Sequence, residues 1–445
     1  MKIHRPAALA VFSATLLVLA AAGCSSSPSS NGGSSNSNSP GSANFGVNAT
    51  GTVNFWARTV SKTLAQKLVS EFNATHSNLK VKLTLTSIND DTTTLATSIR
   101  AGDPPDVVGL NDIDMPTFTR NGSFMNLTKA IAALPFAKSL SPGHLGLATY
   151  QGQEYGLPYW GDLSVLWYNK NLFKEAGLDP NKPPASYADI LADAQAINKL
   201  GNGINGFTFA GDCEGCLGFT VQPGIWADGK HLTEGPIGTQ TATITGNTAL
   251  MAALALYRDM WSQHLVPDND RTDNGPTWGQ DFVAGKIGIM PGGYGQVTTL
   301  AKPSQLGTEF MDTPLPGENG GYSTFDGGDD FAIPAQAKNP SGAWEFIQWV
   351  MQPQQQDQYP DLGATPIRTD VLTPQFATEH PLDAVALKAL ARGYAPVTLV
   401  YDQMFNQAGG PWFQMFSTAV YDGNMNAALQ QGQSGLTHLL QQAFP

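Results

Sequence analysis

The sequence QEYGLPYWGDLSVLWYNKNLF, residues 153–173, passes from a polar turn through two aromatic residues and a carboxylate into an apolar run. The run over residues 163–168 lies between a glycine and an Asn-Lys-Asn turn, which predicts a buried strand. At the entrance of this strand, Tyr159 and Trp160 offer ring faces and Asp162 accepts hydrogen bonds, a combination that suits a polar ligand with apolar faces. The same residues also fit an ordinary sheet whose aromatic side chains only fill the core.

The composition sets the size and the class of the protein. With 445 residues the chain is long enough for two or three domains, and 41% hydrophobic residues are enough to build a large core. The formal net charge is −12, with only 24 Lys and Arg residues and no basic run. Such a chain does not favour nucleic acid or an anionic membrane surface as a partner, and its acidity mainly supports solubility.

The first residues predict export. Lys2, His4 and Arg5 precede an apolar run over residues 7–22, which is short for a membrane span of about 20 residues and ends in Ala-Ala-Gly-Cys. Cys24 after Ala-Gly resembles the bacterial lipobox, in which the cysteine is acylated and becomes the new N-terminus, although the usual leucine three positions earlier is alanine here. An ordinary secreted protein with an unmodified cysteine is the alternative.

A segment of low complexity follows the cysteine. Residues 25–49 are mostly Ser, Gly, Asn and Pro, and such a segment cannot bury enough apolar surface to offset its chain entropy. We therefore expect a signal peptide over residues 1–23, a flexible tether over residues 24–50 and then a large body. This order describes a domain held at the outer face of the cell membrane.

The body begins with alternating strands and helices. Residues 53–56, 79–86 and 106–110 have the apolar or alternating patterns of strands, while residues 61–75 and 95–101 have helical spacing. This order predicts an α/β lobe with a largely parallel sheet. Ligands of such sheets lie beyond the carboxyl ends of the strands. Here those ends carry Trp56, Arg58, Asn111 and Asp112.

Several segments together resemble one protein family. The sequence YNKNLFKEAGLDPNKPPASYADI covers residues 168–190, and GDPPDVV covers residues 102–108. Three further motifs are DFVAGKIGIM at 281–290, FDGGDDFAIP at 325–334 and GATPIRTDV at 363–371. From about residue 53 to residue 444 the chain resembles the extracellular solute-binding proteins of sugar ABC transporters, the maltose-binding-like group.

The resemblance implies an α/β fold of the periplasmic-binding-protein type, class II, in which two α/β lobes surround a ligand cleft. Three hinge crossings are expected near Asp162, Met290 and Phe331. The resemblance places residues 51–160 and 291–331 in the N-terminal lobe, and residues 161–290 and 332–445 in the C-terminal lobe.

The implied function is that of a lipid-anchored, extracytoplasmic substrate-binding protein of an ABC importer. It captures a mono- or oligosaccharide by hinge closure and delivers it to the membrane subunits of the permease. The resemblance implies a monomer that needs no catalysis, cofactor or metal.

The candidate ligand contacts combine ring faces with groups that bond hydroxyls. A pyranose ring stacks its apolar face on an aromatic ring, while its hydroxyl groups need carboxylates, amides and guanidinium groups. For each residue alone a structural role is an equal alternative, but the set as a whole, placed at the crossings that the family uses, predicts a carbohydrate cleft. The candidates are Trp56, Arg58, Asn111, Asp112, Tyr159, Trp160, Asp162, Trp226, Tyr294, Asp329, Arg368 and Trp412.

Cys213 and Cys216 form a C-x-x-C pair. In an exported chain this spacing favours a short structural disulfide that stiffens a loop beside the cleft. A thioredoxin-like redox site would need the pair at a helix N-terminus, whereas these cysteines follow a strand-like segment over residues 207–210. Zinc would need two more ligands, and neither another Cys nor a close His is available.

Other motifs do not support catalysis or cofactor binding. GNGING at residues 201–206 follows a helix and precedes a strand, the reverse of the order in a dinucleotide site, so we interpret it as a turn. The acidic loop at residues 268–275 lacks the glycine position and the final Glu of a calcium-binding EF-hand. A glycoside hydrolase stays an alternative because carboxylates are plentiful, but no spacing singles out a pair. Asp329 and Asp330 are adjacent, so in an extended segment they point to opposite faces.

Two further alternatives stay open. A glycerophosphodiester or another phosphorylated polyol would want cationic side chains at the cleft, which Arg58 and Arg368 supply. An adhesin or scaffold lipoprotein would bind no small ligand, and its thermal stability would not respond to one.

Overall fold

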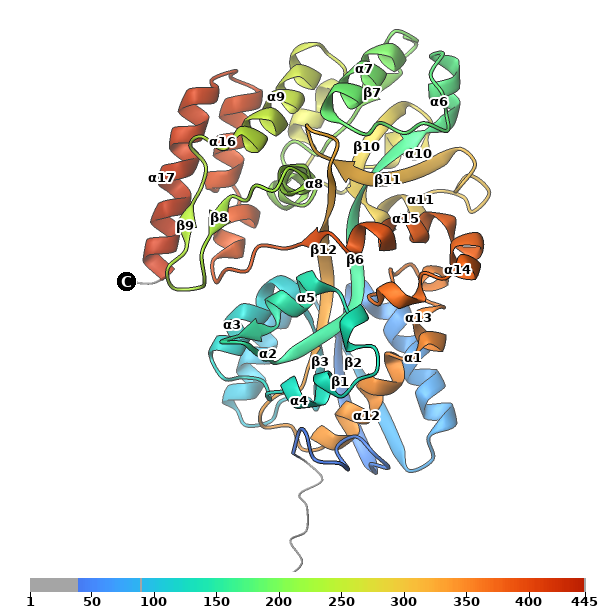
Figure 1. The fold of residues 1–445 in the computed structure, drawn as a ribbon, viewed down its shortest axis with the longest axis vertical. Helices are drawn as coiled ribbons and strands as arrows, with labels where there is room; N and C mark the ends of the chain where they lie inside the picture. Colours follow the sequence, from blue (N-terminus) through green and yellow to red (C-terminus); the bar gives the residue numbers. More distant parts are fainter. Residues whose placement is uncertain (1–38, 89, 444–445) are drawn as a thin grey trace, which may run out of the picture. The chain divides into compact units, whose positions relative to one another are not determined.

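The computed structural model describes residues 39–443 except residue 89. At its centre is an antiparallel pair of long strands, β6 (Gly156–Asn169) and β12 (Tyr322–Ala332), which run through both lobes of the described chain (Figure 1). Every residue of β6 except Asp162 is buried, which means that both faces of the sheet are covered there. The full strand order is β2-β1-β3-β12-β11-β6-β10-β7, and the direct pairing of β12 with β6 adds to it.

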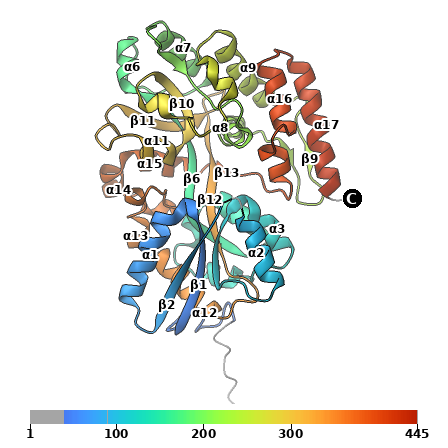
Figure 2. The ribbon, with the colours of Figure 1, turned by 180° about the vertical axis from the view of Figure 1, so that it is seen from behind.

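The first lobe is built on parallel strands. β1 (Gly51–Arg58) lies between β2 (Leu79–Thr86) and β3 (Val107–Asn111). Figure 2 shows these strands from behind, with α1 (Lys62–Thr75) beside them. The other helices and strands of this lobe are α2 (Asp91–Arg100), α3 (Met115–Arg120), α4 (Thr128–Ala132), α5 (Pro142–Leu147), β4 (Thr149–Tyr150), β5 (Gln153–Glu154), α12 (Pro340–Val350) and α13 (Pro353–Gln356).

The second lobe carries most of the helices. Its strands β10 (Ile287–Gly293) and β11 (Phe310–Pro316) each pair antiparallel with β6, and β7 (Asn205–Phe207) pairs parallel with β10. Its helices are α6 (Lys170–Glu175), α7 (Tyr187–Asn198), α8 (Glu214–Ala227), α9 (Thr248–Ser262), α10 (Gln280–Val283), α11 (Tyr294–Leu300), α14 (Pro374–Glu379), α15 (Pro381–Leu390), α16 (Pro411–Val420) and α17 (Met425–Ala443). Three short strands, β8 (Thr233–Glu234), β9 (Thr241–Ala242) and β13 (Gly393–Tyr394), complete it.

The strand and helix pattern predicted for the first lobe agrees with β1, α1, β2, α2 and β3, but one of the three expected crossings, the one near Met290, and part of the lobe boundaries differ. The chain passes from one lobe to the other near Asp162 in β6 and near Gly327 in β12. The chain does not pass between the lobes at Met290, because β10 pairs with both β6 and β7 of the second lobe. Residues 291–316 therefore belong to the second lobe as well. The remaining connection runs from α13 to α14 and touches β6 where Thr365 pairs with Gly161.

Helix α12 lies in the first lobe, although residues 332–445 were expected to form part of the second. Its Phe346 packs against Phe55 of β1 and Phe72 of α1, with ring centroids 5.4 and 5.2 Å apart. The helical spacing of apolar residues shows that a helix has a buried face, but not which lobe provides the core that it meets. This is why the sequence pattern misplaced α12.

The last part of the predicted tether is folded against α12. Phe45 is 5% exposed and stacks on Trp344 with ring centroids 5.9 Å apart. The backbone N–H of Gly46 donates to Ser341 Oγ at 2.9 Å. A single aromatic residue in a polar segment is enough to attach it to the body, so the flexible tether predicted over residues 24–50 is wrong for its last residues. The predicted signal peptide and Cys24 lie outside the described residues. Among the described residues, no helix has the length and apolar character that crossing a membrane requires.

Candidate ligand cleft

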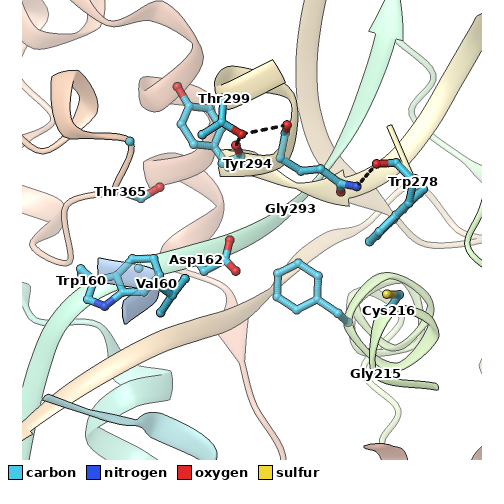
Figure 3. A pocket seen from close by; sticks show the side chains of 15 residues that line it. Val60, Trp160, Asp162, Gly215, Cys216, Trp278, Gly293, Tyr294, Thr299 and Thr365 are labelled. Atoms are coloured by element: carbon cyan, nitrogen blue, oxygen red, sulfur yellow. Dashed lines mark hydrogen bonds between the residues drawn. The ribbon is translucent and has the colours of Figure 1, made fainter. Parts of the chain in front are cut away.

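Two cavities lie beside the segments of β6 and β12 that cross between the lobes. Their volumes are about 540 Å³ and about 210 Å³. Their walls have Val60, Trp160, Asp162, Gly215 and Phe219 in common, so the two cavities form one continuous cleft. Figure 3 shows the larger cavity, in which Trp160 and Asp162 of β6 lie on one side and the end of α8 on another.

The smaller cavity lies at the carboxyl ends of β1 and β3, where parallel strands commonly bind ligands. Arg58 at the end of β1 is held from two sides: its Nη1 lies 2.6 Å from Asp329 Oδ1, and its Nε lies 2.9 Å from Asp91 Oδ2. Burial lowers the pKa of the Arg58 guanidinium, but the two carboxylates outweigh burial and leave this pKa above its ordinary value. Arg58 is therefore a fixed cation whose charge is already balanced by its own neighbours.

Asp162 faces both cavities from β6. Burial raises the pKa of the Asp162 carboxyl to about 6, with Arg58 opposing and Asp329 adding to the shift. A carboxyl with this pKa is mostly ionised at neutral pH and still gains a proton under mild acid. It can accept hydrogen bonds from ligand hydroxyl groups without the need for a cation in the ligand.

Aromatic rings supply the apolar part of the cleft. Trp160 and Trp278 are 7% and 9% exposed, and both indole N–H groups lack a hydrogen-bond partner among the described residues. Phe219 of α8 packs against Phe325 with ring centroids 5.2 Å apart. Tyr294 also lines the larger cavity, but its hydroxyl donates to Asp383 at 2.6 Å and is not free. The cleft thus offers ring faces and unused indole donors next to a carboxylate.

A buried charge cluster lies behind the smaller cavity. His144 of α5 is fully buried, with Nδ1 2.9 Å from Asp326 Oδ1 and Nε2 3.8 Å from Asp112 Oδ2. Burial would lower the pKa of His144, but the surrounding carboxylates, Asp326 above all, raise it to about 10. Ser141 donates a hydrogen bond to Asp326. The imidazolium therefore links α5 of the first lobe to β12 at the crossing.

The fold and the family follow from comparison with known proteins. The model of the bacterial extracellular solute-binding protein family matches this chain over residues 67–385. The chain belongs to this family. Family membership identifies it as a solute-binding protein and not as an enzyme. The sugar-binding protein MalE from Xanthomonas citri has the same fold, with a TM-score of 0.78 and 21% identity over 88% of this chain and 98% of that chain. The predicted α/β periplasmic-binding-protein fold is confirmed.

Curated relatives of this solute-binding protein are more distant. The diacetylchitobiose binding protein DasA of Streptomyces coelicolor is 23% identical over 296 residues, which cover 64% of this chain and 65% of that protein. The sn-glycerol-3-phosphate-binding protein UgpB of Brucella abortus is 27% identical over 159 residues, or 33% of this chain and 35% of that protein. In these matches the chain spans less than two thirds of the length of either relative.

The solute-binding protein brings part of the predicted contact set together. The residues that line the cleft are Arg58, Asn111, Asp112, Trp160, Asp162 and Tyr294. Asp329 lies directly behind this wall, bound to Arg58 and fully buried. That the lining residues contact a ligand stays a prediction.

Other predicted contacts belong to the core. Trp226 lies inside α8 and packs on Phe325 and Tyr394, with ring centroids 5.6 and 5.0 Å apart. Trp412 in the first turn of α16 is fully buried. Pro223 and Gly224 suggest a loop before Trp226, yet both lie within the helix. Local loop signals do not tell which way a ring points, and here they were misleading.

Three more predicted contacts do not line the cleft. Tyr159 is fully buried and stacks on Phe331 with ring centroids 4.2 Å apart. Arg368 is also occupied: its guanidinium bonds Asp370 through Nε and Nη2 and lies 3.9 Å from the centroid of the Phe136 ring. Trp56 is partly buried against the core that includes helices of both lobes. In the structure these side chains are occupied by contacts with other side chains of the protein.

Some lining residues escaped the sequence reasoning. Trp278 follows Pro276 and precedes Gly279, which is the same loop signal that singled out other tryptophans, so it could have been found. Phe219 could not, because it lies in an apolar helix where phenylalanine usually means core.

Cys213 and Cys216 form a disulfide in the structure. The expectation that the pair follows a strand away from any helix N-terminus is wrong, because Cys213 is the N-cap of α8 and Cys216 lies in its first turn. Cys216 lines the larger cavity. Among the described residues, no group of His, Cys, Asp and Glu is arranged to hold a metal ion.

Proposed function

We propose that this solute-binding protein is the lipid-anchored, extracytoplasmic binding component of a carbohydrate ABC importer and that it captures a mono- or oligosaccharide. The observation that carries the proposal is the cleft itself. Ring faces of Trp160, Phe219 and Trp278 lie in the same walls as the carboxylate of Asp162. A pyranose needs both, since its C–H face stacks on aromatic rings and its hydroxyl groups bond to polar side chains.

The charge of the cleft favours a neutral ligand. Arg58 is the only Lys or Arg among the described residues that line the two cavities, and Asp329 and Asp91 already neutralise it. A phosphate group would meet the carboxyls of Asp162 and Asp112 without a free cation to balance it. Arg368, the other candidate cation, is bound to Asp370 and does not line the cleft. The partial similarity to a glycerol-3-phosphate-binding protein keeps a phosphorylated polyol as the alternative.

Closure of the two lobes is the proposed mechanism of capture. Only a closed form contacts the ligand from both lobes, so the ligand shifts the balance between open and closed forms toward closure. The closed form then docks on the permease subunits. The proposed anchor is acylated Cys24, which keeps the protein close to that permease.

The decisive experiment is a thermal-shift screen of residues 37–445, which form one compact unit of their own. The screen covers mono-, di- and oligosaccharides together with glycerophosphodiesters. A ligand at 100 times its Kd adds about 2.7 kcal/mol to the free energy of unfolding, which raises Tm by several degrees. We expect a shift with a sugar that is recovered unmodified. A shift with phosphodiesters alone would establish the alternative, and no shift with any compound would contradict a carbohydrate cleft.

A further inference from the structure

The disulfide between Cys213 and Cys216 borders the larger cavity of the cleft. Cys213 is the N-cap of α8, a helix of 14 residues, and its Sγ accepts a hydrogen bond from the backbone N–H of Cys216 at 3.2 Å. Cys216 and Gly215 line the larger cavity, and Figure 3 shows Cys216 beside that cavity at the end of α8. One sulfur therefore has access to the cleft, while the other receives a donor of the helix N-terminus.

This bridge contributes little to holding the chain together. Only Glu214 and Gly215 lie between the two cysteines, and a disulfide restricts the unfolded chain less as the loop that it closes becomes shorter. The helix is secured by its own buried side chains, which include Leu217, Val221 and Ile225. The fold is therefore expected to survive reduction of the bridge.

We propose that Cys213–Cys216 is an exchangeable disulfide, open to a dithiol reductant that enters through the cleft. A thiolate of the reductant attacks Cys216 Sγ, the S–S bond breaks, and Cys213 leaves as a thiolate. The N–H of Cys216 and the positive end of α8 stabilise that leaving group. The second thiol of the reductant then attacks the mixed disulfide and releases Cys216. Two electrons and two protons pass to the two cysteines, and the dithiol becomes a cyclic disulfide.

Reduction also changes the wall of the cleft. A Cβ at Gly275 would lie 3.4 Å from both sulfur atoms, so the backbone of this loop packs directly on the bridge. Two thiol sulfurs separate from the bonded distance of about 2.0 Å to van der Waals contact. Three residues further along the same loop, Trp278 lines the larger cavity. We therefore expect reduction to shift the Trp278 ring and to alter ligand affinity, and this last effect rests on the proposed function.

The test uses residues 37–445, which contain Cys213 and Cys216 as their only cysteines. The folded protein is treated with dithiothreitol at pH 7 without denaturant, alkylated and weighed by mass spectrometry. We expect two alkylated thiols per chain, full reversal by oxidised glutathione, and a change in tryptophan fluorescence. The fluorescence change should be absent in W278F and retained in the matched variant W261F, whose ring lies in α9.

Single variants test the direction of attack. In C213S the remaining Cys216 should react rapidly with a small aromatic disulfide. In C216S the thiol of Cys213 should titrate below the ordinary pKa of about 8.5, measured as thiolate absorbance, because the backbone donor is still present.

A bridge that resists dithiothreitol until the protein unfolds would overturn the proposal. An ordinary or raised pKa for Cys213 in C216S would overturn its role as the leaving group. None of these measurements needs a sugar, so the proposal can fail while the ligand screen succeeds, and the ligand screen can fail while the disulfide exchanges.

Discussion

Replacing Arg58 by Met removes one cation from between two carboxylates while keeping most of the side-chain volume. Asp329 is fully buried, its Oδ1 bonds Arg58, and its Oδ2 has no partner among the described residues. Breaking a buried ion pair from one side costs about 3–5 kcal/mol, since the remaining charge stays buried without compensation. Because the Arg58 side chain is 14% exposed and water screens that end of the pair, we expect R58M to lower the free energy of unfolding by about 3 kcal/mol.

The assay is urea unfolding of residues 37–445 as a double-mutant cycle with D329N. Removing the second charge should restore much of the loss, so R58M/D329N should be more stable than R58M alone.

A loss in R58M below about 0.5 kcal/mol would refute this reasoning, since that is the contribution of a solvent-exposed pair. If R58M loses the predicted stability but R58M/D329N is no more stable than R58M, the charge of Asp329 is not the cause of the loss. Arg58 would then act by packing its aliphatic stem rather than by charge.

Further predictions concern pH, the ligand and the anchor. His144 has a folded pKa raised to about 10 and Asp330 one raised to about 7, so the stability from both is complete at low pH and lost as pH rises through these values. Calorimetry should show stability falling between pH 4 and pH 10, by up to about 1.4 kcal/mol per pH unit for each group, with the part below pH 7 reduced in D330N. For a sugar found in the screen, affinity should rise between pH 5 and pH 7 as Asp162 ionises, and calorimetric titration of D162N should show no such rise. W278A should weaken that affinity at least tenfold, whereas W226F, a change in the core of α8, should leave Kd within about twofold. In bacteria expressing the full chain, C24S should abolish palmitate labelling, and persistent labelling would contradict the anchor.

Periodicity was sufficient for β1, α1, β2, α2 and β3, because each of these segments buries one consistent face or both. The strand predicted over residues 163–168 is part of β6, but β6 already begins at Gly156, so Tyr159, Trp160 and Asp162 lie within the strand and not before it. It was not sufficient for lobe boundaries. Met290 and α12 were misplaced because an apolar strand or helix reports that it is buried and not what it is buried against. Which lobe receives an element is decided by pairing between residues far apart in the sequence, such as Phe346 with Phe55.

Candidate site residues on strand ends were predicted better than those in helices and loops. Arg58, Asn111 and Asp112 line the cleft because carboxyl ends of parallel strands meet at one edge of a sheet. Trp226 and Trp412 do not, since a helical residue's direction depends on how its helix is rotated. For side chains on helices, the sequence supplies the chemistry and the tertiary packing supplies the orientation.

Asp329 and Asp330 show how far a local rule reaches. Adjacent residues of a strand point to opposite faces, and the pair does so: Asp329 bonds Arg58, while the charge of His144 acts on Asp330. The rule did not foresee that neither faces solvent. β12 pairs with β3 along one edge and with β6 along the other. Both carboxyls are fully buried, so other parts of the protein cover both faces of the strand there.

Where β12 passes between the lobes, two adjacent glycines, Gly327 and Gly328, directly precede these two carboxyls. Gly328 has φ +135°, and a Cβ there would lie 2.0 Å from the carbonyl oxygen of Trp160, so only glycine fits. Its neighbour Gly327 pairs with Asp162 on β6. Neither glycine has a side chain of its own that a rotation of the backbone would have to move, whereas one residue further on Asp329 is fixed by Arg58. The proposed hinge is thus limited to a short segment with a rigid ion pair at its edge, so that closure would move the lobes as bodies and leave the cleft wall formed by Arg58 and Asp162 in place.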